Sequence, residues 1–429
     1  MQAAWNFLRR CVAVFRTAID RTTRQPVLGI FAVLNAVGMT FVAARYLISV
    51  QGITDPSGRV ITGDFLAFYT AARLLAGPHP LQLYDVSAQQ ALEQSLVVHS
   101  NVAFQPFAYP PLLAMALRPL AFQPYQTAFY VYVAATLLVL GTSLWTLRVH
   151  LPALCGSLSG FATTVLLVAG FHPVVRTAIG GQTSGLSLSL WLGFFAALHG
   201  GRPGLAGMWL GLLSFKPQLA LLLGGALLVR REYRALVVAA CVAVAHYGLA
   251  AFALGWSWPL QMLDFLSAYQ PLEEGSNLFT HASLLPLFKQ LVGVPMGTPI
   301  GIGSSAAIVL WVLWYARTYS GPPAALWGLV FAAALVTSPY LQYYDVALAV
   351  VPALLGLHAL LEAGRRISFG IRIALAAVFV GYPVYELGAM LGFQPLAVVL
   401  LLLLTWLAHV SRSLSQPGAR LPGSVGSLA

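Results

Sequence analysis

The sequence has little charge: only 8% of its 429 residues are Asp, Glu, Lys or Arg, and only two are lysine. Soluble domains carry about 25% charged residues. With 59% hydrophobic residues and a mean hydropathy of +0.80, the chain lacks the polar surface that a soluble core needs. These values exclude a soluble globular protein, a disordered chain, a coiled coil and collagen. They predict a multi-pass membrane protein.

Cysteines are also scarce, and the three that are present, Cys11, Cys155 and Cys241, have no CxxC spacing. Their positions in or beside apolar segments indicate buried thiols rather than a disulfide framework or a zinc site. The motifs GxxxxGK[ST], HExxH and GxSxG are absent, as is a DxD metal motif. The sequence therefore indicates no cofactor and no metal.

The net charge of +11 and the pI of about 9.8 would suit a nucleic-acid-binding protein, but the distribution of the charge argues against one. The arginines form short clusters between apolar runs, as they do in the cytoplasmic loops of helical membrane proteins. No basic stripe with interleaved aromatic residues is present. We therefore expect membrane lipids, and no nucleic acid, as partners.

The apolar runs predict an all-α polytopic membrane protein, a single integral membrane domain over residues 1–429 with about twelve transmembrane helices. Residues 203–214 and 216–230 are too short to cross separately, which predicts a re-entrant hairpin or a tilted pair broken near Lys216–Pro217. The expected spans are 27–49, 124–147, 157–175, 183–200, 203–214, 216–230, 234–254, 300–318, 323–338, 344–361, 369–387 and 393–410.

The positive-inside rule places both termini in the cytoplasm. The first apolar stretch is long enough to span, so it is expected to be an uncleaved helix rather than a signal peptide. The tail 411–429 is rich in Gly, Pro and Ser and is expected to be flexible. The arginines that this orientation places inside are Arg148, Arg202, Arg230, Arg231, Arg234, Arg317, Arg365, Arg366, Arg372, Arg412 and Arg420.

This orientation leaves two long segments, 50–125 and 256–299, outside the membrane. In the first, Gly63–Leu75 has apolar residues at helical spacing and predicts an amphipathic helix lying at the interface, ended by Gly77–Pro78. Asp85 is expected to cap the next short helix.

Asp64 is the first candidate for chemistry. It stands in the first turn of the expected interfacial helix, where the helix dipole favours an ionised carboxylate, and Tyr69 and its aromatic neighbours would form an apolar wall beside it. One interpretation is a general base on the outer face of the membrane. The other is a helix N-cap, a frequent position for Asp.

Three further polar residues lie in or beside apolar runs. Lys216, in SFKPQ, either binds an anionic phosphate or snorkels to the interface. Gln182, in the glycine-rich GGQTSG, stands near Arg176, and the two either bind hydroxyls and phosphate or belong to a tight turn.

A late segment, SPYLQYYD, carries Tyr340, Tyr344 and Asp345 at the outer end of an expected span. Aromatic faces beside a carboxylate suit a sugar, although interfacial tyrosines are a common alternative. His281 and Asn277, in SNLFTHAS, are weaker candidates.

The motifs GDFLAFYTAARLLAGPHPLQLYD, YPPLLAMALRPLA, GGQTSGLSLSL, LAGMWLGLLSFKPQLALLL and SPYLQYYDVALAVVP follow one another from Thr62 to Pro352. In order and spacing they resemble glycosyltransferase family 87, which is similar to other polytopic GT-C enzymes and includes polyprenol-phosphate-mannose-dependent mannosyltransferases. Many members have a histidine after the late Ser-Pro, whereas this chain has Tyr340.

The resemblance implies transfer of a monosaccharide, mannose in several members, from a polyprenyl-phosphate-linked donor to a lipid or glycan acceptor on the outer face of the bacterial plasma membrane. It implies Asp64 as the acidic catalytic residue of an inverting reaction. Gln182 matches the family's GQ motif, and Lys216 and Gln218 match its KPQ motif. In this interpretation Lys216 and Arg176 bind the donor phosphate. The substrate-binding residues are expected to be Gln182, Tyr69, Gln218, Tyr340, Tyr344, Asp345 and His281.

A polytopic transporter or flippase is the alternative, because broken helices and intramembrane charges also occur in transporters. No inverted repeat is visible, and the polar candidates gather on one face of the membrane. A non-catalytic scaffold for envelope assembly is a third possibility, for which Asp64→Asn would be silent.

Overall fold

The structure, a computed structural model, describes residues 26–49, 62–96, 104–276, 278–365, 388 and 390–415. The expected span 369–387, Asn277, Cys11 and the tail beyond Ser415 lie outside the described residues. Every regular element of the described part is helical. The α-helices are α2 (Pro26–Ser49), α3 (Phe65–Ala76), α4 (Val86–Leu96), α5 (Leu112–Leu117), α6 (Tyr125–Leu147), α7 (Pro152–Cys155), α8 (Leu158–Gly170), α9 (His172–Ile179), α10 (Ser184–His199), α11 (Pro203–Leu212), α12 (Leu221–Val229), α13 (Tyr233–Leu254), α14 (Trp258–Ser276), α15 (Leu284–Val292), α16 (Val294–Thr318), α17 (Pro323–Thr337), α18 (Val350–Glu362) and α21 (Pro395–Ser415).

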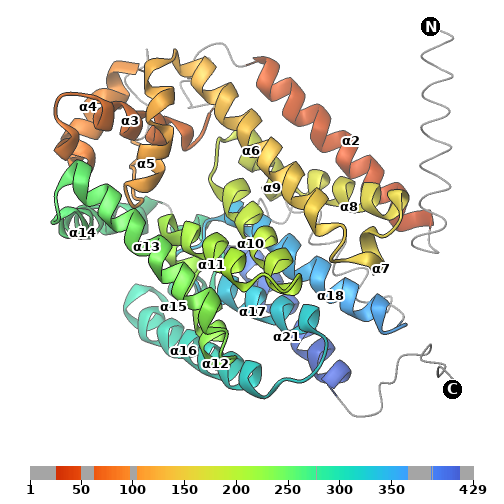
Figure 1. The fold of residues 1–429 in the computed structure, drawn as a ribbon. Coiled ribbons are helices and arrows are strands. Elements are labelled where there is room, and N and C mark those ends of the chain that lie inside the picture. The colour runs from red at the N-terminus through yellow and green to blue at the C-terminus, as the bar shows by residue number, and fades with distance from the viewer. Residues whose placement is uncertain are drawn as a thin grey trace, which may run out of the picture.

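Short 3₁₀ helices connect several of these elements. They are η1 (Pro80–Tyr84), η2 (Arg118–Phe122), η3 (Leu213–Phe215), η4 (Pro217–Leu219), η5 (Leu278–Thr280) and η6 (Tyr343–Ala349). In Figure 1, α3, α4 and α5 gather at one end of the molecule next to α14, while α2 and α6 run along one edge. The other helices form the body of the bundle, where α17 packs against α18 and α21.

The expected count of about twelve spans is not confirmed. Within the described residues, five helical segments are long and apolar enough to cross a membrane, and a sixth joins α8 and α9 across a 66° bend. The five are Tyr125–Leu147, Tyr233–Leu254, Val294–Thr318, Tyr343–Glu362 and Pro395–Ser415.

The difference arises mainly from short, buried helices. The 16 residues of α10 and the 15 of α17 extend only about 24 and 22 Å, less than the hydrocarbon core of about 30 Å. Every residue of α17 from Ala324 to Val336 is buried. A helix that is apolar all round belongs in a core as readily as in lipid. The expected break at Lys216–Pro217 is present, between η3 and η4.

The helix expected over Gly63–Leu75 is present as α3, but it does not have the exposed polar face that was expected of an interfacial helix. Residues Phe65–Ala72 are all buried, and α4, α5, η1 and η2 pack against them. The segment 62–122 therefore packs in a second apolar core around α3, which residues of α6, α13 and α14 complete, beside the larger core of the bundle. Asp85 does cap α4: its carboxylate accepts hydrogen bonds from Ser87 Oγ at 2.6 Å and the Ala88 amide at 3.0 Å.

Glu93 in α4 makes the stability of this segment depend on pH. Its side chain is buried, one carboxylate oxygen has no partner, and the other accepts a hydrogen bond from the Gln105 amide. Burial raises the pKa of Glu93 to about 8. The folded state therefore holds a proton that the unfolded state loses above its ordinary pKa of 4.5. Stability should fall as pH rises from 4.5 to about 8 and change no further above it.

Glu93→Gln removes this titration and keeps the shape of the protonated side chain. We expect the variant to lose less thermal stability than the wild type between pH 5 and about 8, as measured by unfolding in detergent at several pH values. Parallel curves for the two proteins would contradict the assignment.

Candidate active site

The candidate site forms where helices begin, end or break. Asp64 directly precedes α3, Arg176 is in the last turn of α9, Gln182 is in the turn before α10, and Lys216 separates η3 from η4. Residues Tyr343–Asp345 open η6. Helix termini expose backbone groups and allow polar side chains to point inward, so these breaks bring polar residues together inside an apolar bundle.

Two glycine turns bring Asp64 to Gln182. Gly63 has a φ of +54°, and a Cβ there would stand 2.8 Å from the carbonyl oxygen of Gly180. Gly181 has a φ of +56°, and its Cβ would stand 2.6 Å from the Cβ of Phe65. Only glycine permits both this backbone conformation and this close approach.

Asp64 occupies the N-cap position of α3, but its side chain makes no capping hydrogen bond. The carboxylate instead accepts a hydrogen bond of 2.7 Å from the Tyr344 hydroxyl and another from the Gln182 amide. Burial raises the pKa of the Asp64 carboxyl above its usual range, although these two hydrogen bonds and the charge of Lys216 act in the opposite direction. A carboxylate with a raised pKa is better suited to accept a proton near neutral pH.

Lys216 and Asp345 form a buried ion pair, with 2.7 Å between Lys216 Nζ and Asp345 Oδ1. Both residues are 3% exposed or less, so Lys216 does not snorkel to the surface. Ser184 Oγ also donates a hydrogen bond to Asp345. The Lys216 ammonium lies over the rings of Tyr109 and Tyr344, 5.6 and 6.0 Å from their centroids.

Arg176 is held differently. Its Nε donates a hydrogen bond of 3.2 Å to the Tyr343 hydroxyl, and no described carboxylate forms a salt bridge with it. Three consecutive residues of η6 thus contact three different partners. Tyr343 contacts Arg176, Tyr344 contacts Asp64, and Asp345 contacts Lys216. A 3₁₀ helix has three residues per turn, so three consecutive side chains leave η6 in three directions.

His281 and Tyr340 lie beside η6. Gln342 forms an isolated β-bridge with His281, and the two side chains are in contact through nitrogens 3.0 Å apart. The amide of Gln342 also donates to the Tyr340 hydroxyl at 3.1 Å, and the His281 and Tyr340 rings meet edge to face.

Two candidates from the sequence do not join this group. The Tyr69 hydroxyl donates to the carbonyl of Gln123, and its ring packs edge to face on Tyr125. Gln218 lies half-buried in η4, and no contact in the described part of the chain connects it with Asp64.

Two residues of the site were not singled out from the sequence, Tyr109 and Ser184. Tyr109 packs against both apolar cores, with its hydroxyl 3.5 Å from Thr183 Oγ1 and its ring beneath Lys216. Two features of the sequence could have indicated these residues. A double proline follows Tyr109, and Ser184 stands two residues after Gln182.

A comparison with protein families identifies the chain. The model of glycosyltransferase family 87 matches residues 107–339, more than half of the sequence. The chain belongs to glycosyltransferase family 87. A search of curated proteins and a search of solved structures found no match.

Family 87 membership makes this protein a membrane glycosyltransferase and favours the enzyme over the transporter. The matched range includes Arg176, Gln182 and Lys216, whereas Asp64 precedes it and Tyr344 and Asp345 follow it. The geometry connects these three to the matched part: Asp64 bonds to Gln182, Asp345 pairs with Lys216, and the Lys216 ammonium lies over the Tyr344 ring.

Proposed function

We propose that this family 87 enzyme transfers a monosaccharide, mannose being the first sugar to test, from a polyprenyl-phosphate donor to a lipid or glycan acceptor. The reaction takes place on the outer face of the bacterial plasma membrane, with both termini in the cytoplasm. The observation that carries the proposal is the Asp64 carboxylate, which stands at an N-cap without capping and is held by Tyr344 and Gln182 instead.

Asp64 acts as the general base of an inverting displacement. It takes the proton of the acceptor hydroxyl while the acceptor oxygen attacks the anomeric carbon from the face opposite the phosphate. The bond between the anomeric carbon and the phosphate oxygen breaks, and polyprenyl phosphate leaves with the electron pair. A phosphate leaves without protonation, so one base is sufficient, as in the base half of an inverting glycosidase.

Arg176 supplies the charge that the leaving phosphate requires. Lys216 can still donate N–H groups to it, but Asp345 already balances the lysine's charge at 2.7 Å. Arg176 has only the Tyr343 hydroxyl as a described side-chain hydrogen-bond partner. A guanidinium can bind two phosphate oxygens at once, which suits a leaving group whose charge grows during the reaction.

Tyr340 and His281 remain the proposed sugar contacts, together with Gln182. The Oε1 atom of Gln182 is buried without a hydrogen-bond partner while its amide bonds to Asp64. That oxygen is placed to accept a hydrogen bond from a substrate hydroxyl next to the base. Tyr69, held by Gln123, and Asp345, held by Lys216 and Ser184, position other parts of the site in this proposal.

The donor class can be tested directly. Membranes containing the protein are incubated with radiolabelled polyprenyl-phosphate mannose, glucose, galactose and arabinose, and in parallel with the corresponding nucleotide sugars. We expect label to enter a new glycolipid or glycan from a polyprenyl-phosphate donor only. Transfer from nucleotide sugars alone would contradict the donor class, and transfer in sealed inverted vesicles alone would contradict the outer face.

Tyr344→Phe should change the pH dependence of transfer. The Tyr344 hydroxyl stabilises the ionised form of Asp64, so its removal raises the pKa of Asp64 further. Since the base must be ionised, the acidic limb of the rate profile should move to higher pH, with a smaller loss of rate at alkaline pH. Tyr343→Phe, which removes the neighbouring hydroxyl that contacts Arg176, should leave that limb in place.

A further inference from the structure

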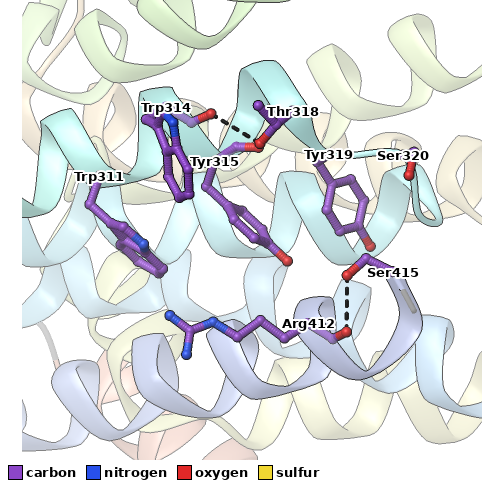
Figure 2. Close-up of a pocket in the computed structure, with 8 residues that line it drawn as sticks. All are labelled: Trp311, Trp314, Tyr315, Thr318, Tyr319, Ser320, Arg412 and Ser415. Carbon is purple, nitrogen blue, oxygen red and sulfur yellow. Dashed lines mark hydrogen bonds between the residues drawn. The ribbon is translucent and has the colours of Figure 1, made fainter. Parts of the chain in front are cut away.

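A second polar site lies between α16 and α21, outside the group around Asp64. Figure 2 shows a pocket with the rings of Trp311 and Tyr315 of α16, and of Tyr319 directly after that helix, extending toward Arg412 and Ser415 of α21. Its volume is about 450 Å³. Trp311 and Tyr315 are four residues apart and share one face of α16. α17 packs against both α16 and α21.

The pocket lies at one end of two candidate spans. Thr318 is the last residue of α16, and Arg412 is in the last turn of α21, so both helices end at the pocket. The first residues of α16 pack on α15, which follows His281. A helix of 25 residues is about 37 Å long, so the pocket lies far from that end of α16.

The charge around the pocket is positive and unbalanced. Arg412 is exposed, and no described carboxylate pairs with it or lines the pocket. Arg230 reaches the same end of α16, where it donates hydrogen bonds to the carbonyls of Ala316 and Tyr319. Arg317, also exposed, precedes Thr318. Arginine beside Trp and Tyr at a helix end is the composition of a membrane interface that faces anionic lipid.

Two hydroxyl groups in the pocket are unpartnered. The hydroxyls of Tyr315 and Tyr319 are buried, and neither has a hydrogen-bond partner in the described structure. The Tyr319 side chain is 7% exposed. Buried hydroxyls without partners are unfavourable, and nearly all of them are satisfied by protein, water or ligand. A phosphate oxygen accepts hydrogen bonds from such hydroxyls and from a guanidinium.

We infer that this pocket binds the phosphate of an anionic membrane phospholipid, with Arg412 and Tyr319 as the principal donors. A lipid is favoured over a free phosphate because the site stands where two spans end and aromatic rings line it. An anionic headgroup is favoured over choline because the Arg412 guanidinium already lies over the Trp311 ring, 5.7 Å from its centroid. A quaternary ammonium there would face a like charge. The inference is independent of the sugar-transfer chemistry.

The test uses native mass spectrometry of the purified full-length protein in detergent, with phosphatidylglycerol, phosphatidylcholine and glycerol 3-phosphate as probes. The wild type should retain phosphatidylglycerol in preference to phosphatidylcholine, and glycerol 3-phosphate should not displace it. Arg412→Gln should weaken retention about tenfold, the effect of losing one charge-assisted hydrogen bond. Arg317→Gln is the matched control: it removes the same charge from an exposed residue outside the pocket lining and should change retention less than about twofold.

Tyr319→Phe separates binding from folding. The hydroxyl has no partner in the protein, so its loss should leave the melting temperature of lipid-free protein unchanged or raised. The same variant should show a smaller rise in melting temperature on adding phosphatidylglycerol. Equal losses in Arg412→Gln and Arg317→Gln would overturn the inference in favour of nonspecific attraction. Equal retention of the two lipids, or displacement by glycerol 3-phosphate, would also overturn it.

Discussion

Replacing Asp64 by asparagine is expected to reduce glycosyl transfer by a factor of about 10² to 10⁴, the contribution of a positioned general base. Asparagine has nearly the same shape, and its carbonyl oxygen can still accept the hydrogen bond from Tyr344. It cannot take a proton from the acceptor hydroxyl. The loss should therefore appear in kcat, with the donor KM largely unchanged.

The matched control is Asp85→Asn. Asp85 belongs to the same segment, 62–122, and caps α4 through Ser87 and Ala88, so the substitution changes stability slightly and should leave kcat within about twofold. Asp64→Asn should keep the wild-type melting temperature or exceed it, because it removes a buried charge. Equal transfer by the wild type and Asp64→Asn would show that Asp64 is not the base.

Lys216→Met is expected to destabilise the protein by about 3–5 kcal/mol, because it leaves the Asp345 carboxylate buried without its cation. Asp345 is 2% exposed, and its one other described partner is the hydroxyl of Ser184. Asp345→Leu alone leaves Lys216 in the same position without its anion and should be destabilising to a similar degree. The double variant, with two apolar side chains in place of the pair, should recover most of the lost stability.

Thermal unfolding of the four proteins in detergent measures this coupling. Arg317→Met, which changes an exposed cation in the last turn of α16, is the control and should lower stability by less than about 1 kcal/mol. Strictly additive losses in the double variant would contradict a coupled buried pair. A double variant that is stable but slow in transfer would show that the ion pair also positions Tyr109 and Tyr344 for the reaction, in addition to its role in folding.

The sequence predicts the helices well because apolar composition identifies the segments that are buried away from water. It does not determine whether lipid or protein surrounds each helix. α13 and α17 illustrate this. Both are apolar, but only 22% of the most apolar window of α13 is buried in protein, whereas α17 is buried from Ala324 to Val336. Hydropathy is high for both helices, so a prediction based on hydropathy takes the buried core helix for a membrane span.

The candidate site shows the same limit for polar residues. Asp64, Gln182, Lys216 and Asp345 stand out in the sequence because a polar group in an apolar surrounding is unfavourable unless it is paired or used. Their pairing does not stand out, since Asp64 and Tyr344 are 280 residues apart and meet only when the segment 62–122 packs on the bundle. Tyr109 was missed because tyrosine is common at membrane interfaces and its double proline explained the segment without it.

The direction of three consecutive side chains in η6 limits how family members can diverge. Each of Tyr343, Tyr344 and Asp345 serves a different partner, so inserting or deleting one residue before them would turn all three away at once. Point substitutions preserve this arrangement, whereas a change of length does not. A chimera designed to exchange substrate preference between relatives should therefore carry the segment 342–345 as one block of unchanged length. This block begins with Gln342, which contacts His281.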